Sequence, residues 1–411
     1  AVVQDALGRL IIDVCEQAAC DRSDVLECVI VGNPVMHHLL LGWSPVELGW
    51  APFALVSNQA QDFPLCQLGS AITDHAFNPG AHSWVLPLIA GHVGADAAAV
   101  ILSEAPQMQD AITLIVDIGT NAEIILGSKA RLLACSSPTG PALEGAQISS
   151  GQRAAAGAIE RVRIDPDTLE PRFKVIGCDR WSNEDGFDDL VAATGVTGIC
   201  GSGIIEVLAE LYLTRIIDVD GRIAPLSERP SARLVQDGRT WCYVLNPACE
   251  AKGWPEIRIT QNDVRAIQLA KAALYAGAQL LVDRLGQKPE RIILAGAFGS
   301  HIDPKSAMIL GMIPDCDLKQ VRQAGNAAGT GARIALLNHA ARLDICKLVR
   351  TIEKIETATE ARFQEHFVEA MAFPHKTAPF PMLKTECALP EPVQTATKAP
   401  GSKRGRRRMK V

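Results

Sequence analysis

Apolar positions recur with a helical period at the start of the chain. Within residues 1–20, Val2, Ala6, Leu10 and Val14 lie near the spacing of one helix face, which predicts an amphipathic helix. A shorter apolar run, CVIVGN, ends in a glycine turn and predicts a buried strand. The N-terminal region therefore combines a helix with a strand.

The clearest strand signal is a pair of apolar runs at 112–117 and 122–127. They flank the turn GTNA, so the pattern predicts a β-hairpin. An acidic residue, Asp117, ends the first run at the mouth of this hairpin.

Several other apolar runs end in a glycine turn that leads into a helix. The pattern predicts a strand and an Ala-rich helix over 84–104, a glycine loop and helix from 197, a strand and capped helix start over 291–304, and a glycine turn and helix from 325. A capping box at Thr260 and Asp263 begins a long helix. Residues 160–190 and 218–258 predict irregular or peripheral β structure. Abundant Ala and Gly, with sparse aromatic residues, indicate an α/β fold.

Four glycine turns are candidates for binding a phosphate: Gly119–Asn121, Gly198–Gly203, Gly296–Gly299 and Gly325–Gly331. Three precede a helix, where unpaired backbone N–H groups and the helix dipole favour an anion. Glycine also lets the main chain approach a phosphate without a Cβ in the way. One such turn is usually structural, but four in an α/β context favour a nucleotide. P-loop, GxGxxG, HExxH, GxSxG and kinase motifs do not occur, which leaves a hairpin-based phosphate site.

In such a site Asp117 holds Mg²⁺ through water or orients the attacking water, and Thr120 and Asn121 bind phosphate oxygens. The alternative is that Asp117 caps the turn and binds no ligand.

Composition narrows the classes of function. The net charge is −6 although the basic run 403–410 holds six cations, so nucleic-acid binding by the fold is not expected. No apolar run reaches the roughly 18 residues of a membrane span. The 12 cysteines include no CxxC pair and no zinc or ferredoxin spacing, which indicates free thiols in a reducing cytoplasm. Residues 373–411, rich in Pro, Thr and Lys, predict a disordered basic tail.

Five segments resemble, in the right order, the acetate-and-sugar-kinase, heat-shock-chaperone and actin (ASKHA) superfamily. VGADAAAVILS looks like its first connecting helix and VDIGTNAEI like its second phosphate motif. ICGSGIIEVL resembles an element of dehydratase activators, LAGAFG looks like the adenosine motif, and GNAAGTGARIALL like the second connecting helix. Over residues 25–372 the chain more closely resembles the reductive activators of corrinoid proteins, with GNPVMHHLLLGWSPVELGWAPF and GPALEGAQISSGQRAAAGAIE among the shared blocks.

The resemblance implies a two-lobed ASKHA fold whose first lobe is incomplete. Residues 1–88 are then a remnant of the middle domain or first lobe, and residues 89–372 form the ATPase domain. The implied activity is ATP-dependent reactivation of a corrinoid protein or a corrinoid-dependent methyltransferase. ATP binding and hydrolysis, with Mg²⁺, drive one electron from a [2Fe-2S] cluster to Co(II) and restore Co(I). A homodimer is implied for the full-length protein.

Two parts of the family pattern are absent from this sequence, the N-terminal cluster domain with its four-cysteine signature and the first phosphate hairpin. The chain is therefore expected to be truncated at its N-terminus. Alone, it is expected to lack the cluster and to bind ATP poorly.

The matched segments give a set of expected site residues. Asp117 and Glu144 are expected to be catalytic, and Asp117 and Asp96 to contact the metal. Nucleotide contacts are expected from Gly119, Thr120, Asn121, Gly201, Ser202, Gly203, Gly296, Phe298, Gly299 and Asn326.

Several side chains keep a second interpretation. Asp96 is equally explained as a favourable charge at a helix N-terminus, and Glu144 as an ordinary loop carboxylate. His37 and His38 are predicted on an extended segment, one buried and one exposed. Lys271 is predicted to be a solvated or snorkelling side chain rather than a phosphate ligand. Two other functions remain open, a small-molecule kinase of the same superfamily and a non-catalytic nucleotide-binding scaffold.

Overall fold

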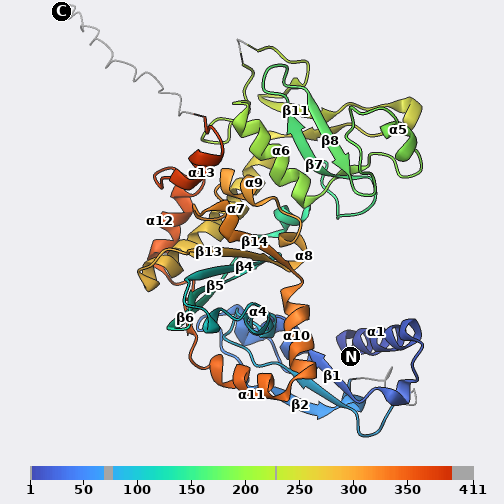
Figure 1. Cartoon of the computed structure of the whole chain (residues 1–411), viewed down its shortest axis with the longest axis vertical. Coiled ribbons are helices and arrows are strands. Elements are labelled where there is room, and N and C mark those ends of the chain that lie inside the picture. Colours follow the sequence, from blue (N-terminus) through green and yellow to red (C-terminus); the bar gives the residue numbers. More distant parts are fainter. Residues whose placement is uncertain (1, 69–76, 227–228, 391–411) are drawn as a thin grey trace, which may run out of the picture.

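The protein is C-shaped, with a central sheet between two lobes (Figure 1). A computed structural model describes residues 2–68, 77–226 and 229–390. The central sheet has six strands in the order β14-β13-β4-β5-β6-β15. Their bounds are β4 Thr113–Ile118, β5 Ala122–Ser128, β6 Arg131–Ser137, β13 Arg291–Ala295, β14 Val321–Gly325 and β15 Glu353–Lys354. This mixed sheet with helices on both faces confirms the predicted α/β class and the 112–127 hairpin.

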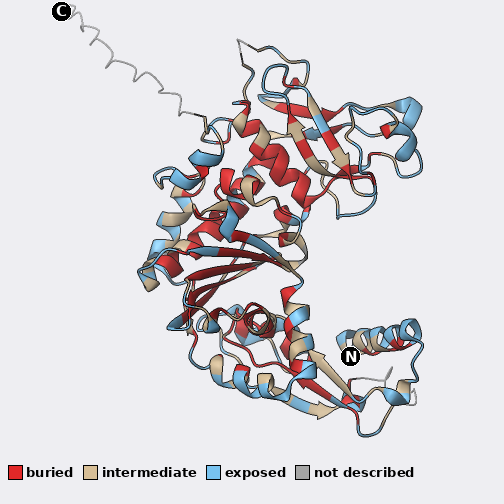
Figure 2. Cartoon of the chain, viewed as in Figure 1, coloured by how far each residue is buried: buried red, intermediate tan, exposed pale blue. Residues whose placement is uncertain are grey.

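Alternate residues of the central strands enter two different cores. Leu114, Val116 and Ile124 pack with the long helix α7 (Gln261–Leu285). Ile115 and Ile125 pack instead with α4 (Ala95–Glu104) and α10 (Ala327–Leu337). Both faces of β4 are covered, so successive side chains are apolar on both sides. The β4 sequence is therefore a continuous apolar run and does not alternate between apolar and polar residues. Figure 2 shows the strands between the two cores mostly in red, as buried residues.

The lower lobe joins the N-terminal region to helices from near the end of the chain. Its three-stranded sheet has the order β1-β3-β2. Its elements are α1 Val2–Ala18, β1 Glu27–Ile30, α2 Pro34–Leu40, β2 Gln61–Pro64, β3 His82–Val85 and α11 His339–Leu348. Arg342 on α11 pairs with Glu27 and lies over the Trp84 ring at 5.1 Å, which fixes α11 against β1 and β3.

The upper lobe carries two small sheets, β8-β7-β9 and β10-β11-β12. Its strands are β7 Ala158–Ile164, β8 Pro171–Val175, β9 Gly198–Ile199, β10 Leu234–Asp237, β11 Thr240–Asn246 and β12 Ile257–Ile259. Six further helices of the described residues belong to the upper lobe or cover the adjacent face of the central sheet. They are α5 Phe187–Leu190, α6 Gly201–Leu213, α8 Gly296–Gly299, α9 Pro304–Ile309, α12 Ala361–Glu369 and α13 Pro381–Glu386. The segments predicted as peripheral β structure therefore form this lobe.

The two histidines of the lower lobe differ from the prediction. They lie on helix α2 and both are buried. The helix begins here because Asn33 caps it, accepting from the Met36 amide at 2.9 Å, and Pro34 occupies the first helical position. His38 Nδ1 lies 2.8 Å from the Pro34 carbonyl oxygen, and its Nε2 accepts from the Val56 amide. These contacts explain His38 as a structural residue.

The predicted disorder from residue 373 is wrong for residues 373–390. Phe373, Phe380 and Leu383 are buried in the core. Lys271, predicted to be solvated, is fully buried and donates to the Ala372 and Pro374 carbonyl oxygens. The Lys271 side chain of α7 therefore ties this segment to the core through two hydrogen bonds. The rest of the predicted tail, 391–411, lies outside the described residues.

We expect Lys271 to contribute to the pH dependence of the free energy of unfolding. Burial lowers its pKa well below the usual 10.5, so between the two values the unfolded chain binds one proton more than the folded chain. The free energy of unfolding therefore rises with pH in that window, by up to about 1.4 kcal/mol per pH unit. We expect Lys271→Met to reduce the gain in urea midpoint between about pH 7 and about pH 9.

The exposed Lys288 gives the control, because Lys288→Met should keep the wild-type dependence. The neighbouring groups His375, with its pKa lowered to about 4, and Tyr275, raised to about 12, ionise outside this range. An unchanged pH dependence in Lys271→Met would show that Lys271 stays charged in its buried position.

Candidate functional site

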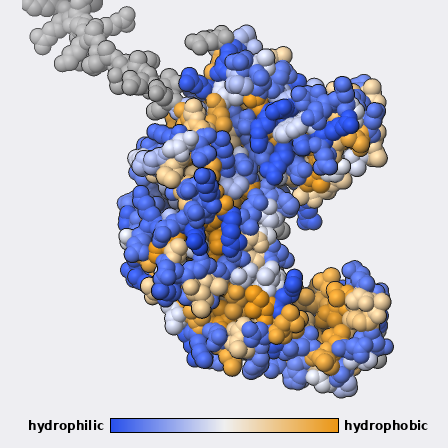
Figure 3. All heavy atoms as spheres, in the orientation of Figure 1, coloured by the Kyte–Doolittle hydropathy of each residue, from blue (hydrophilic) through white to orange (hydrophobic). Residues whose placement is uncertain are grey.

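Three parallel strands end together at one edge of the central sheet. Ala295 at the end of β13 lies in register with Asp117 of β4 on one side and Gly325 of β14 on the other. Figure 1 places α8 and α10, which follow β13 and β14, at the end of the sheet that faces the notch between the lobes. The space-filling view shows the notch as a deep hollow (Figure 3). Ligands of open α/β sheets bind at the carboxyl ends of strands, so this edge is the candidate site.

Gly296 lies directly against the Asp117 carboxylate. Its φ is +88°, and a Cβ there would approach Asp117 Oδ1 to 2.6 Å and the Ile118 carbonyl oxygen to 2.8 Å. Only glycine adopts this backbone conformation without strain and leaves the carboxylate in place. The glycine turn after β13 therefore shapes the surroundings of Asp117.

Three carboxylates share this end of the sheet. Asp117 and Glu123 are cross-strand partners, and as odd-numbered residues they point to the α4 face, where Asp96 begins the helix. Burial, and then the charge of Asp96, raise the pKa of Asp117 to about 6. Burial, and then the charges of Asp96 and Asp117, raise the pKa of Glu123 well above its usual value. Burial also raises the pKa of Asp96, against a hydrogen bond from the Ala97 amide. A cation placed here would relieve this repulsion.

The sequence analysis missed Glu123. The signal was present, because a hairpin turn centred on residue 120 pairs 117 with 123, which puts two acids on the same face. Ser136 Oγ on β6 lies 3.3 Å from Glu123 Oε1 and holds this side chain from the neighbouring strand.

The hairpin turn lies beside the exposed carboxylate of Glu144. Thr120 Oγ1 donates to Glu144 Oε1 at 2.7 Å, and the Thr120 carbonyl oxygen accepts from the Gly140 amide at 2.8 Å. Thr120 and Asn121 are exposed, so their polar groups are open to solvent. The structure thus joins the predicted turn to Glu144, which stands on the short turn Pro141–Glu144.

The two glycines in the first turn of α6 allow close packing. A Cβ on Gly201 would lie 2.2 Å from Phe298 Cε2 and 2.1 Å from the Leu143 carbonyl oxygen, so three segments meet there. A Cβ on Gly203 would lie 2.4 Å from the Ile159 carbonyl oxygen. Ser202 is buried, with its Oγ 3.3 Å from Cys200 Sγ. Ser202 therefore faces protein atoms in this conformation, and the two glycines pack against the main chain of Leu143 and Ile159.

Asn326 completes the edge on the β14 side. It is the N-cap of α10, and its Oδ1 accepts from the Gly329 amide at 2.8 Å. Asn326 is an exposed residue. Gly299 packs against Leu294 at ordinary contact distance and makes no closer approach.

The site chemistry fits a hydrated divalent cation. Across residues 2–68, 77–226 and 229–390, no group of three His, Cys, Asp or Glu side chains is arranged to hold a metal ion by itself. Mg²⁺ keeps several waters and takes only one or two protein carboxylates when it binds with phosphates. Asp117 and Asp96 supply that number, and Glu123 adds a third negative charge nearby.

This combination of a central mixed sheet, a carboxylate at the mouth of a phosphate-type hairpin, and glycine turns at strand ends defines an ASKHA-type domain. The family model described as the C-terminal domain of RACo, the ASKHA domain, matches residues 111–384, and the RACo middle region matches residues 1–110. The chain belongs to this family, as its motifs indicated.

Two relatives match most of this chain. It is 34% identical over 380 residues to the corrinoid activation enzyme RamQ of Eubacterium limosum, covering 89% of this chain and 59% of RamQ. It is 26% identical over 375 residues to the [Co(II) methylated amine-specific corrinoid protein] reductase of Methanosarcina barkeri, covering 86% of this chain and 64% of that protein.

A solved structure of the same kind of protein has a similar fold. The reductive activator for corrinoid,iron-sulfur protein superposes with a TM-score of 0.75 at 30% identity, covering 90% of this chain and 56% of that one. The chain thus spans somewhat under two thirds of the length of these relatives. Within the described ranges, no helix combines the length and apolar character that crossing a bilayer requires.

Proposed function

We propose that this chain is the ATP-hydrolysing part of a cytoplasmic protein that reductively reactivates a corrinoid protein. The observation that carries the proposal is the carboxylate-lined strand edge in a chain of the RACo family. The printed names of the relatives support the substrate class. In the reaction the cobalt of the corrinoid gains one electron, passing from Co(II) to Co(I), and a [2Fe-2S] centre outside residues 1–411 loses one. The complete protein acts as a homodimer on a corrinoid protein or corrinoid-dependent methyltransferase.

Different residues at the strand edge bind the metal ion and the phosphates. Asp117 and Asp96 hold Mg²⁺, and Glu123 adds negative charge beside them. Thr120, Asn121 and the main chain of Gly119 contact phosphate oxygens, and Glu144, bonded to Thr120, orients the attacking water.

The remaining contacts of the nucleotide come from the neighbouring turns. They are Gly201, Ser202, Gly203, Gly296, Phe298, Gly299 and Asn326. Mg²⁺ bound at this site would neutralise part of the negative charge of the phosphates.

Reactivation of a Co(II) corrinoid protein tests this proposal. The complete protein that contains this chain is mixed with the Co(II) corrinoid protein, a chemical reductant and MgATP, and the absorbance of Co(I) is followed. We expect Co(I) to accumulate only with MgATP and phosphate to be released as it forms. Transfer of the γ-phosphate to a sugar or carboxylate, with no Co(I), would instead identify a small-molecule kinase. MgATP binding without phosphate release or Co(I) would identify a scaffold.

The raised pKa of Asp117 predicts how MgATP binding depends on pH. Below a pKa of about 6 the carboxyl is neutral and cannot hold the cation. The Mg²⁺-dependent part of the ATP affinity should therefore fall about tenfold per pH unit below about pH 6. Calorimetric titration between about pH 5 and about pH 8 measures this.

ATP phosphates titrate in a similar range, so Asp117→Asn is the control. It should show a weaker dependence, which comes from the nucleotide and from Asp96 and Glu123, whose pKa values are also raised. Equal pH dependence in both proteins would remove Asp117 from cation binding.

A further inference from the structure

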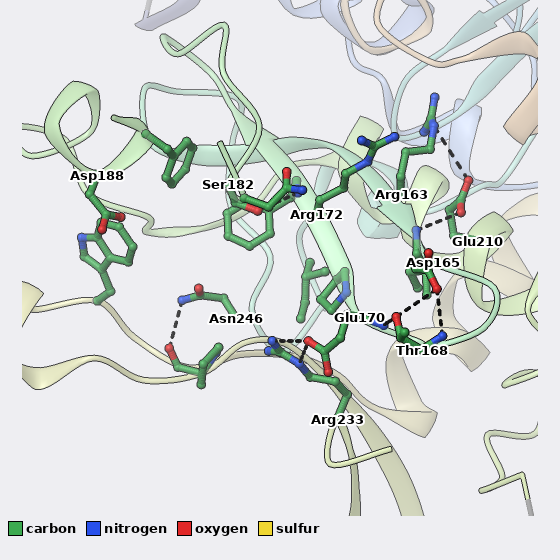
Figure 4. A pocket seen from close by; sticks show the side chains of 18 of the residues that line it. Arg163, Asp165, Thr168, Glu170, Arg172, Ser182, Asp188, Glu210, Arg233 and Asn246 are labelled. Atoms are coloured by element: carbon green, nitrogen blue, oxygen red, sulfur yellow. Dashed lines mark hydrogen bonds and ion pairs between the residues drawn. The ribbon is translucent and has the colours of Figure 1, made fainter. Parts of the chain in front are cut away.

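A cavity of about 850 Å³ lies in the upper lobe, between the β7–β8 hairpin and the segment 245–254 (Figure 4). Four cations and four carboxylates of the described residues line it, among them the bonded pair Arg233 and Glu170. Because these charges balance, the cavity favours no ionic ligand of either sign. A pair of cysteines at the end of α1, in the lower lobe, indicates a further chemistry more directly (Figure 1).

Cys15 and Cys20 lie at the two ends of the turn that closes α1. The Cys20 amide donates to the Cys15 carbonyl oxygen at 3.1 Å, and the Ala19 amide donates to the Glu16 carbonyl oxygen at 3.2 Å. Ala19 has a φ of +51°, in the left-handed region. These two bonds around one left-handed residue form the Schellman motif, which ends many helices. The side chains at the first and last positions of this motif often contact each other, and here both are thiols.

The two thiols are in contact but differ in their access to solvent. Cys15 is 2% exposed, on the face of α1 that packs on the lower lobe with Gly8 and Ile12, whereas Cys20 is exposed. Burial, and then a side-chain hydrogen bond with Cys20, raise the pKa of Cys15. A disulfide requires two Cα atoms about 4.4–6.8 Å apart, and the direct hydrogen bond between their main chains holds these two residues in close approach.

The chain on the far side of Cys20 is fixed as well. Asp21 caps the next turn, accepting from the Ser23 amide at 2.8 Å and from Ser23 Oγ at 2.6 Å. Arg22 Nη2 lies 3.0 Å from Glu16 Oε1, which ties this turn back to α1. Cys20 is therefore held beside Cys15 from both sides, and such positioning favours a bond within the chain over a bond to a second molecule.

Other buried thiols of the described chain contact main-chain oxygens instead of a second sulfur. Cys135 Sγ donates to the Gly277 carbonyl oxygen at 3.6 Å, and Cys316 Sγ donates to the Glu290 carbonyl oxygen at 3.5 Å. These contacts suit structural cysteines. An exposed thiol beside a second thiol that can resolve a mixed disulfide is instead typical of redox-sensing proteins.

We propose that Cys15 and Cys20 form a redox-active pair, which a small-molecule disulfide oxidises to a disulfide within the chain. The exposed Cys20 attacks the S–S bond of the oxidant as a thiolate, forms a mixed disulfide and releases one thiol of the oxidant. Cys15 then loses its proton and attacks the Cys20 sulfur, which displaces the second thiol. Two electrons and two protons pass from the pair to the oxidant. The proposal does not depend on the reaction proposed above.

Trypsin isolates this pair on a single peptide. Cleavage after Arg9 and Arg22 releases residues 10–22, which contain Cys15, Cys20 and no other cysteine. The complete protein is incubated with oxidised glutathione, quenched with acid, unfolded, alkylated with iodoacetamide and digested. We expect mass spectrometry to find this peptide without alkyl groups and about 2 Da lighter than its reduced form, in at least about tenfold excess over its glutathione adduct.

Two controls separate closure of the pair from simple exposure of a thiol. Cys66, exposed on the short turn Leu65–Gln67, should carry glutathione. Removing the resolving thiol, as in C15A, should leave glutathione on Cys20. Alkylation of both cysteines in the wild-type peptide overturns the proposal, and so does a wild-type peptide with glutathione on Cys20 and an alkylated Cys15. The wild-type peptide decides by itself, so a C15A protein that does not fold leaves the test intact.

Discussion

Replacing Asp117 by Asn should lower Mg²⁺-dependent ATP hydrolysis at least about a hundredfold, because it removes the negative charge that holds the cation at the strand edge. The fold should survive. Asn has the same shape, and it relieves the repulsion from Asp96 that helps to raise the pKa of Asp117 to about 6. The unfolding free energy should therefore be unchanged or slightly higher at neutral pH, where the ionised wild-type carboxylate is destabilising. Phosphate release and urea unfolding, both measured on the complete protein, check the two halves of this expectation.

Asp110→Asn is the matched control. It makes the same chemical change on an exposed carboxylate just before β4, where Asp110 pairs with Lys129, so hydrolysis should stay within about twofold of wild type. Glu123→Gln should lie between the two variants, because Glu123 contributes charge but is held by Ser136. Full turnover in Asp117→Asn would remove this residue from the mechanism.

Replacing Gly331 by Val should destabilise the protein by about 3 kcal/mol. Gly331 lies where α10 crosses α4, and a Cβ there would approach the Ala99 carbonyl oxygen to 1.9 Å and its Cα to 2.8 Å. Backbone atoms cannot rotate away as a side chain can, so the helices must separate. Asn326 caps the start of α10 and Asp96 lies in the first turn of α4, so the separation should reduce MgATP affinity as well as stability. Urea unfolding and calorimetry measure the two effects.

Arg333→Val controls for the β-branched residue itself. It introduces the same side chain on the exposed face of α10, so only the small loss of helix propensity, below about 1 kcal/mol, is expected. Similar destabilisation in both variants would mean that the α4–α10 crossing tolerates a larger residue.

Local sequence patterns predicted most of the elements that form the strand edge. The apolar runs around GTNA predicted the hairpin, and the capping box at Thr260 and Asp263 predicted the start of α7. The capped helix start predicted at the end of residues 291–304 is the start of α9, which Asp303 caps. These signals are local because caps and turns satisfy backbone groups within a few residues of themselves. The order of the glycine turns carried the family resemblance, which the family models confirm.

The predictions from local sequence were wrong for Lys271 and for residues 373–390. Lys271 has the polarity of a surface residue, yet it is buried because the Ala372 and Pro374 carbonyls, a hundred residues later, accept its hydrogen bonds. Residues 373–390 have a disorder-like composition, yet Phe373, Phe380 and Leu383 find a place in the core. Both outcomes depend on partners that are distant in the sequence.

The sequence by itself determined the strands, the helix starts and the turn that bears Asp117, since each is specified by neighbouring residues. Only the tertiary structure decided that Asp96 and Glu123 share the face of Asp117, and that burial raises the pKa of all three carboxyl groups. The physical reason is that charge repulsion and burial depend on distances between segments, and these are set when the two cores pack on opposite faces of the central sheet.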